Sequence, residues 1–266
     1  MPLLPSRQLD TVALFEEERN GRFHYAATGF FCRHRFVGEK SVDAMFLVTS
    51  AQAMRGNLDG RVLIGRRRRR AHPLVEPVTD KRGFARRTWF SDDECGLAVL
   101  PLDPEYLART RLRFQAVSTT KGALTLSAMR RKRIGEGDDV LVLGFGPVLE
   151  RLRPVPLVRR GIVARIHDCY QGLSNAFLVD ATTFEGNRGG PVLMKPHRPA
   201  ADRARSDPAG KLIGVVAESL PNPWGPVEAT HDGRRLNVQV NTGLVRVVPV
   251  DALLRVLEQA RPGGHS

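Results

Sequence analysis

Short runs of apolar, mostly β-branched residues follow one another along almost the whole chain, each ended by Gly, Pro, Asn or charged residues. Many such runs at close spacing favour a sandwich or barrel over alternating strands and helices. Only "VDALLRVLEQA", residues 250–260, has apolar side chains at helical spacing, followed by the stop signal Pro262-Gly263. The sequence therefore predicts an all-β fold with a C-terminal helix. The strand candidates are residues 11–16, 23–34, 44–50, 61–65, 96–102, 112–117, 139–145, 161–167, 176–181, 211–219, 236–240 and 244–249.

The composition excludes several classes of protein. Hydrophobic residues make up 42% of the 266 residues, enough for a packed core. No stretch approaches the roughly 18 apolar residues of a membrane span, and the N-terminus has no signal-peptide pattern. The three cysteines, Cys32, Cys95 and Cys169, have spacings that suit neither a disulfide framework nor a zinc site. We expect a cytoplasmic protein with no membrane partner, no metal and no cofactor.

The formal net charge of +13 leaves two explanations open. Nearly all of the 41 basic residues are arginines, as in proteins encoded by GC-rich, typically bacterial, DNA. Alternatively, the runs at residues 66–70 and 130–133 form a surface that binds nucleic acid or another polyanion, with a steep dependence on salt. An aromatic content of 6% argues against a stacking platform for single strands.

Three segments stand in an order that is typical of one protein family. They are "ATGFFCRH" with "FLVTSAQAM", then "DDECGLAVLPL", then "LVDATTFEGNRGGPVL". They resemble the segments that carry the histidine, the aspartate and the serine of trypsin-like serine peptidases. "GEGDDVLVLGFGP" and "VNTGLVRVVPVDALLRVLE" resemble that family's second-barrel stretch and its closing strand and helix. The resemblance implies two packed six-stranded antiparallel β-barrels: one lobe at 1–115, a second at 116–248, and a C-terminal helix and tail at 249–266.

Each position that the resemblance assigns to the catalytic triad holds another residue. Gln52 stands at the histidine position, Gly96 at the aspartate position and Arg188 at the serine position. Glutamine does not titrate, glycine has no side chain that could orient a base, and a protonated arginine is no nucleophile. The sequence therefore predicts no catalytic residues, and the resemblance implies a pseudoprotease.

A rebuilt hydrolytic site is the alternative. Ser50 lies two residues before Gln52 on the same strand face, and His34 and Asp92 lie in neighbouring segments. No base adjoins Ser50 in the sequence, so an active serine protease is the less favoured interpretation.

The serine loop keeps the residues that its backbone needs. In the family, an oxyanion hole is formed by main-chain N–H groups of this loop, which here comprises Gly186, Asn187, Arg188 and Gly189. Such donors beside a guanidinium would suit a bound anion. Alternatively, Arg188 fills the cleft and pairs with a nearby acid such as Glu185 or Glu218.

A second binding feature follows from the resemblance. The residues Ala217, Glu218 and Ser219 resemble the strand edge to which the substrate backbone adds in trypsin-like peptidases. Strand addition needs only main-chain groups, so it does not require catalysis. The predicted function is therefore the binding of a protein or peptide partner in the cleft between the barrels, with polyanion binding as the alternative.

Overall fold

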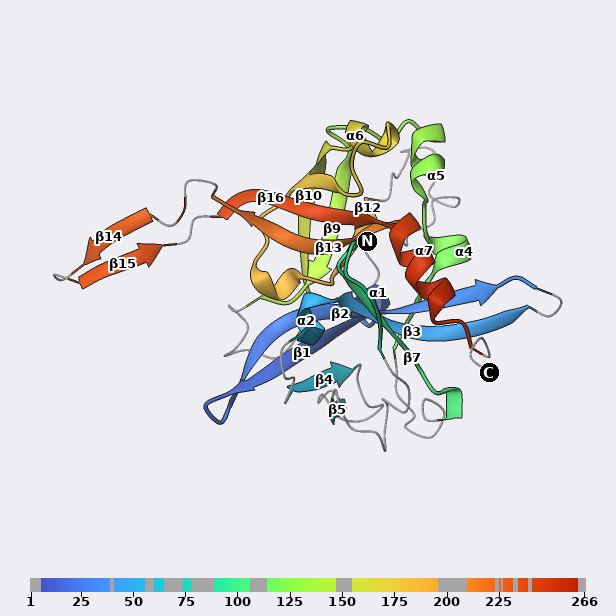
Figure 1. The fold of residues 1–266 in the computed structure, drawn as a ribbon, viewed down its shortest axis with the longest axis horizontal. Coiled ribbons are helices and arrows are strands. Elements are labelled where there is room, and N and C mark those ends of the chain that lie inside the picture. The colour runs from blue at the N-terminus through green and yellow to red at the C-terminus, as the bar shows by residue number, and fades with distance from the viewer. Residues whose placement is uncertain are drawn as a thin grey trace.

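The structure is a computed structural model, and it describes residues 6–38, 41–55, 60–64, 74–77, 89–105, 114–146, 155–195, 210–222, 225, 227–231, 234–238 and 241–262. The described residues form two β-lobes, with a helix at the C-terminal end that lies against both (Figure 1). All three cysteines are free and buried.

The first lobe is one eight-stranded sheet in the order β5-β4-β1-β2-β3-β7-β6, with β8 beside β2. Its longest strand, β2, alternates buried Cys32, His34 and Phe36 with the exposed Arg33 and Arg35 at its end, as expected of a strand with one face on a core. The strands are β1 (Val12–Arg19), β2 (Arg22–Phe36), β3 (Val42–Ser50), β4 (Gly60–Ile64), β5 (Leu74–Pro77), β6 (Phe90–Asp92), β7 (Leu97–Pro101) and β8 (Val117–Ser118).

The second lobe is a closed six-stranded barrel in the order β10-β11-β16-β13-β12-β9. Valine, leucine and isoleucine fill its interior, including the fully buried Val142, Val179 and Val247. The hairpin β14–β15 extends away from this barrel (Figure 1). The strands are β9 (Asp139–Gly144), β10 (Leu157–Arg165), β11 (Phe177–Asp180), β12 (Pro191–Met194), β13 (Leu212–Pro221), β14 (Val227–His231), β15 (Arg234–Val238) and β16 (Asn241–Pro249).

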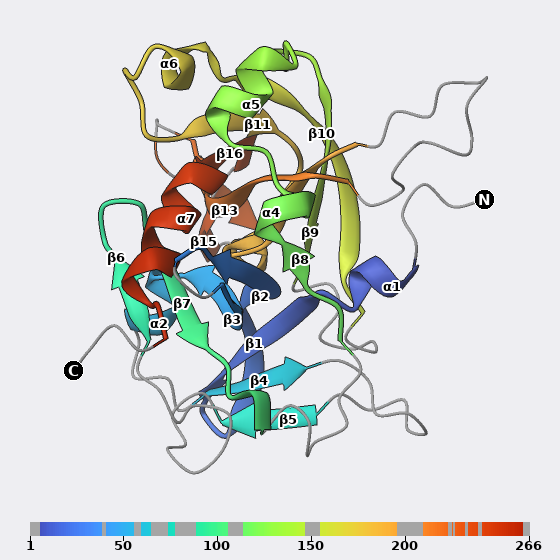
Figure 2. The same ribbon diagram turned by 90° about the vertical axis from the view of Figure 1, so that its right-hand side faces the viewer.

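The C-terminal helix α7 (Val250–Gln259) contacts strands of both lobes: β6 and β7 of the first, β13 and β16 of the second (Figure 2). It buries Leu253, Val256 and Leu257, which lie on one face of a helix with a polar opposite side. Its Asp251 carboxylate also accepts a hydrogen bond from the Leu126 N–H at 2.7 Å. The helix therefore holds the two lobes together.

The other helices are short and lie at ends of strands or in connections. Two of them follow N-cap residues, Ser118 and Thr125, whose hydroxyls accept a backbone N–H. These helices are α1 (Ser6–Leu9), α2 (Gln52–Arg55), α4 (Thr119–Gly122), α5 (Leu126–Arg131), α6 (His167–Tyr170) and the 3-10 turn η2 (Glu185–Asn187).

The predicted all-β fold with two packed β-lobes and a C-terminal helix is confirmed, and the second lobe is a six-stranded barrel as expected. The first lobe is a sheet of eight strands among the described residues, where six were expected. The domain boundaries at 115 and 248 stay predictions. Among the described residues, no helix has both the length and the apolar character that a membrane span requires.

Candidate functional site

The segment that holds Arg188 lies between β11 and β12 and is fixed to the first lobe through Thr28 of β2. The Thr28 hydroxyl donates to the Gly186 carbonyl at 2.6 Å and accepts from the Phe145 N–H at 3.0 Å. The Thr28 N–H donates to the Arg188 carbonyl at 2.8 Å. Thr28 is fully buried, so this set of hydrogen bonds is shielded from water.

Asn187 fixes the same segment from within. Its side-chain amide donates to the Phe145 carbonyl at 3.0 Å, and its side-chain oxygen accepts from the Phe184 N–H at 2.9 Å. The residue is 1% exposed. Both polar ends of a buried asparagine are thus satisfied, and the turn has one defined position relative to the barrel.

Gly189 is required where the turn approaches the first lobe most closely. Its φ is +79°, and an added Cβ would lie against the Thr28 carbonyl oxygen, 2.5 Å from the Thr49 hydroxyl and 2.7 Å from the Ser50 nitrogen. A side chain is therefore excluded by both the backbone conformation and the space.

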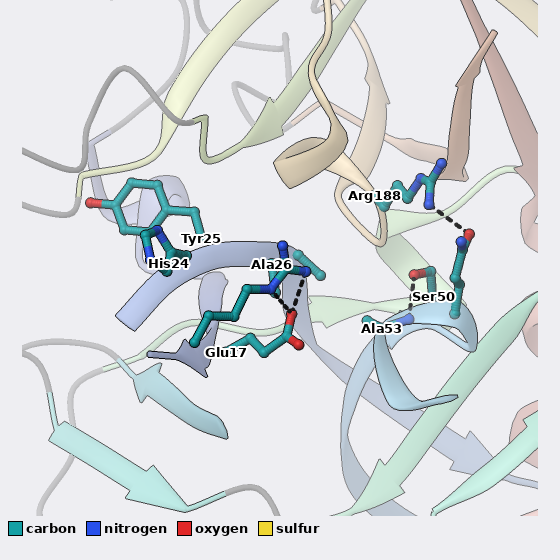
Figure 3. Close-up of a pocket in the computed structure, with 10 residues that line it drawn as sticks. Glu17, His24, Tyr25, Ala26, Ser50, Ala53 and Arg188 are labelled. Carbon is teal, nitrogen blue, oxygen red and sulfur yellow. Dashed lines mark hydrogen bonds and ion pairs between the residues drawn. The ribbon is translucent and has the colours of Figure 1, made fainter. Parts of the chain in front are cut away.

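The residues at the histidine and serine positions contact each other. Arg188 Nη1 donates a hydrogen bond to Gln52 Oε1, and the two atoms lie 2.6 Å apart (Figure 3). Arginine has only donors, so the amide oxygen of Gln52 must face Arg188 and its NH₂ group must point elsewhere. Of the two acids expected beside Arg188, Glu218 lies 3.8 Å from Arg246 instead, and the Glu185 side chain is outside the described residues.

The residue at the aspartate position lies next to these two. The Gly96 carbonyl accepts from the Ala51 N–H at 2.8 Å, one residue before Gln52. Gly96 has a φ of +71°, and a Cβ built on it would meet no other heavy atom within 4 Å. The structure therefore brings the three positions together as the resemblance implies, and the group at Gly96 is backbone alone.

The residues considered for a rebuilt hydrolytic site do not form one. The Ser50 hydroxyl accepts from the Ala53 N–H at 3.3 Å at the start of α2, so it acts as a helix cap. His34 lies near α7, with Nδ1 2.8 Å from the Thr119 hydroxyl and Nε2 3.3 Å from Glu258 Oε1. The Asp92 carboxylate accepts from the N–H groups of its own turn. In the described part of the chain, the Ser50 hydroxyl therefore has a backbone N–H as its hydrogen-bond partner and no base.

The main-chain donors of the loop largely serve its own fold. Asn187 N–H donates to the Phe184 carbonyl at 2.9 Å and closes the 3-10 turn η2, and Gly189 N–H donates to the Val216 carbonyl at 2.8 Å. The loop thus keeps the glycine-dependent turn that was predicted from the sequence. Its use as an anion-binding nest stays a prediction.

A cavity of about 300 Å³ opens beside Arg188 and Gln52. Its lining includes Glu17 and Arg19 of β1, His24 and Tyr25 of β2, and Ser50. His24 and Tyr25 lie on the side opposite Arg188, and Ser50 lies on the same side as Arg188 (Figure 3). The Glu17 carboxylate accepts from Arg19 at 2.7 and 3.1 Å. The sequence alone does not reveal these residues of β1 and β2, because no local pattern connects them with Arg188, more than 160 residues later.

The strand edge proposed for peptide binding is part of β13. Glu218 and Ser219 pair with Arg246 and Val245 of β16 on one side, whereas β12 pairs with β13 only up to Val215. The Ser219 hydroxyl lies 2.6 Å from that of Thr183. Beyond Val215, the segment Ala217–Ser219 is therefore paired with β16 and is not paired with β12 among the described residues.

The arginine runs are only partly within the described residues. Residues 66–70 and 85–87, and Arg151 and Arg153, lie outside them. Arg130–Arg133 lies at the end of α5, and Arg160 Nε donates to Asp139 at 2.7 Å. The guanidinium of Arg159 lies 4.9 Å from the centre of the Phe184 ring. Polyanion binding by these arginine runs stays a prediction.

Comparison with solved structures finds a similar fold in the HtrA-type protease AlgW. A structure of an AlgW variant with a tripeptide matches 98% of this chain at a TM-score of 0.53 and 18% sequence identity. A structure of AlgW with a decapeptide matches 96% at a TM-score of 0.52 and 17% identity. The chain spans 63% and 65% of the length of these two structures, respectively. No protein-family model matches the sequence, and no curated protein matches it either. The chain therefore has the fold of the trypsin-like serine proteases.

Proposed function

We propose that this chain is a trypsin-like protease homologue that has lost triad catalysis and binds a protein or peptide partner through the cleft between its lobes. The hydrogen bond from Arg188 to Gln52 carries the proposal. It occupies the place where a serine hydroxyl would be activated by a histidine, and neither partner can lose or accept a proton near neutral pH.

The chemistry of acyl transfer requires a nucleophile, a base and a group that orients the base. Arg188 supplies a fixed cation, Gln52 a neutral amide, and Gly96 only its backbone. The assembled site therefore lacks all three functions. Ser50 does not replace the nucleophile, because its hydroxyl caps α2. Removal of the whole triad reduces even an efficient protease to the weak residual effect of its binding groups.

Two features support binding as the retained role. The loop glycines and the Thr28 contacts keep the cleft geometry without any catalytic side chain. The segment Ala217–Ser219 has no partner strand beyond Val215 on its β12 side among the described residues, which suits the addition of an extended peptide through main-chain hydrogen bonds. The two structures of AlgW, which has the same fold, are of that protease with a tripeptide and with a decapeptide.

Fluorophosphonate labelling of the purified chain tests the loss of catalysis. The expected result is no labelled serine, in parallel with an active trypsin-like protease as the positive control. The companion variant is Gln52→His with Gly96→Asp and Arg188→Ser. The change at Gly96 places a side chain at a φ of +71°, which side chains disfavour, so folding of this variant must be verified first. Labelling of any serine in the natural chain would overturn the proposal.

Binding is tested by selecting peptides from a random decapeptide library on the immobilised protein. Selected peptides should lose affinity when a bulky side chain replaces Ala217, and keep it when the exposed Leu173 of the second lobe is replaced by alanine. Because Ala217 is only 9% exposed and belongs to the core, circular dichroism must first show that its variant is folded. Selection of no peptide, or only of peptides that 1 M salt removes, would favour polyanion binding instead.

A further inference from the structure

The side chains of Arg188 and Gln52 together present hydrogen-bond donors and no free acceptor. The acceptor of Gln52, Oε1, is already used by Arg188 Nη1 at 2.6 Å. The remaining groups are the Gln52 NH₂ and the other guanidinium N–H groups of Arg188. Within the described residues, Arg188 Nε is buried without a hydrogen-bond partner, which is an uncompensated loss of hydration.

The cavity beside this pair has an excess of positive charge. Among the described residues that line it, Glu17 is the only carboxylate, and its charge is balanced by Arg19 at 2.7 Å. Of the two arginines that line the cavity, Arg188 is therefore the one that forms no ion pair with a carboxylate of the described residues. A half-buried guanidinium in this situation attracts an anion more strongly than one on an open surface, because the surroundings screen its charge less.

We propose that this cavity binds a carboxylate of a peptide, with Arg188 and Gln52 as the two donors that hold it. The inference rests on the proposed function and names the chemistry that the cleft selects. A carboxylate accepts hydrogen bonds at both oxygens and matches the planar, forked donors of a guanidinium. A volume of about 300 Å³ is large enough for a chain end or one acidic side chain.

The position of the pair also suits this ligand. In a serine protease fold, the nucleophile lies beside the carbonyl carbon of the peptide bond that is cleaved. The charged carboxylate of a peptide C-terminus is built on such a carbonyl carbon, so it can occupy the same place. The residue after Arg188, Gly189, donates its N–H to the Val216 carbonyl of β13 at 2.8 Å, so a peptide that lies along the β13 edge passes beside Arg188 and can bring its C-terminal carboxylate or an acidic side chain to it. The replacement of the nucleophile by arginine then changes a site for cleavage into a site for recognition.

The test is an NMR titration of the ¹⁵N-labelled full chain at constant ionic strength. The probes are N-acetyl-dialanine, its C-terminal amide, and the α-amide of N-acetyl-glutamate, which offers only a side-chain carboxylate. The side-chain signals of Arg188 and Gln52 report on the site itself. At least one of the two acids should shift them in a saturable manner, and the neutral amide should not. Which acid binds more tightly identifies the source of the carboxylate.

Three variants separate specific binding from general charge. Arg188→Gln should weaken binding of the acid about tenfold to about a hundredfold, the usual loss for a charge-assisted hydrogen bond. Arg33→Gln is the matched control, because it removes one positive charge from an exposed position on β2 and should leave the affinity within about twofold. Gln52→Glu should abolish binding, since it places a carboxylate of the protein itself against Arg188.

The inference is overturned if the amide binds as tightly as the acids, if none of the probes shifts the Arg188 and Gln52 signals, or if Arg33→Gln weakens binding as much as Arg188→Gln. These outcomes leave the proposed function standing when selected peptides still bind and no serine is labelled. Serine labelling together with normal carboxylate binding would instead remove the proposed function and keep the anion site.

Discussion

The contact between the two lobes at Thr28 gives the most direct test of how the Arg188 loop is held. The change Thr28→Val keeps the shape of the side chain and removes only the hydroxyl. Two groups then lose their partner: the Gly186 carbonyl, now 2.6 Å from the hydroxyl, and the Phe145 N–H, at 3.0 Å. Both residues are buried, so water cannot easily replace the lost hydrogen bonds.

The expected loss of stability follows from these two groups. A buried polar group without a partner costs about 1 to about 3 kcal/mol, so two of them lower the free energy of unfolding by about 2 to about 6 kcal/mol. With a urea dependence of about 3 kcal/mol per molar for a chain of this size, the midpoint should fall by about 0.7 to about 2 M. Thr49→Val is the control, because it removes one hydrogen bond, to the Thr28 carbonyl at 2.8 Å, and should have about half the effect.

The assay is urea unfolding followed by circular dichroism and by tryptophan fluorescence, whose transitions must coincide. A midpoint for Thr28→Val that equals that of the unmodified chain would refute the reasoning. So would a larger effect of Thr49→Val than of Thr28→Val, because the hydroxyl of Thr28 would then not be the principal link.

Three further predictions concern single residues. Gly189→Ala should destabilise by more than about 3 kcal/mol, since its φ of +79° and its close contacts leave no room for Cβ; near-normal urea unfolding would contradict this. Arg160 and Lys195 lower the pKa of Asp139 from 3.8 to about 2, so this carboxylate stabilises the fold above about pH 4 and the contribution disappears as pH falls toward 2. Asp139→Asn should therefore lower the urea midpoint at pH 7 and change it little at pH 2, and equal effects at both pH values would disprove the assignment. Burial raises the pKa of the Cys32 thiol to about 12, so a disulfide reagent at pH 8 should modify it only after urea unfolding, and mass spectrometry of the intact folded protein would reveal any earlier reaction.

Much of the fold was predictable because local patterns determine it. The helix expected at residues 250–260 is observed at Val250–Gln259, and the run at 139–145 forms β9. The short helix α5 was missed, although its cap Thr125 gives a recognisable signal, because six residues with one buried side chain show no clear helical period. Short helices of this kind depend on tertiary contacts. In α5 this contact is the hydrogen bond that the Leu126 N–H donates to the Asp251 carboxylate.

The site was predictable in its positions and not in its contacts. The order of the motifs identified Gln52, Gly96 and Arg188, and the structure brings these three together. The partner of Arg188 was expected among acids close in sequence or on β13, whereas the observed partner is an amide 136 residues away. The cavity lining from β1 was equally hidden, because it depends on how two lobes pack rather than on any one segment.

The dependence of the loop on Thr28 also has a consequence for the order in which the molecule matures. Thr28 and Gly186 are separated by 158 residues, so on the ribosome the first sheet is made long before the segment that it will fix. Contacts of such separation form late, because closing a long stretch of chain is entropically unfavourable until other parts are in place. The geometry of the Arg188 loop should therefore appear only in the final step of folding, and a nascent or truncated chain should lack the cleft through which we propose that a partner binds.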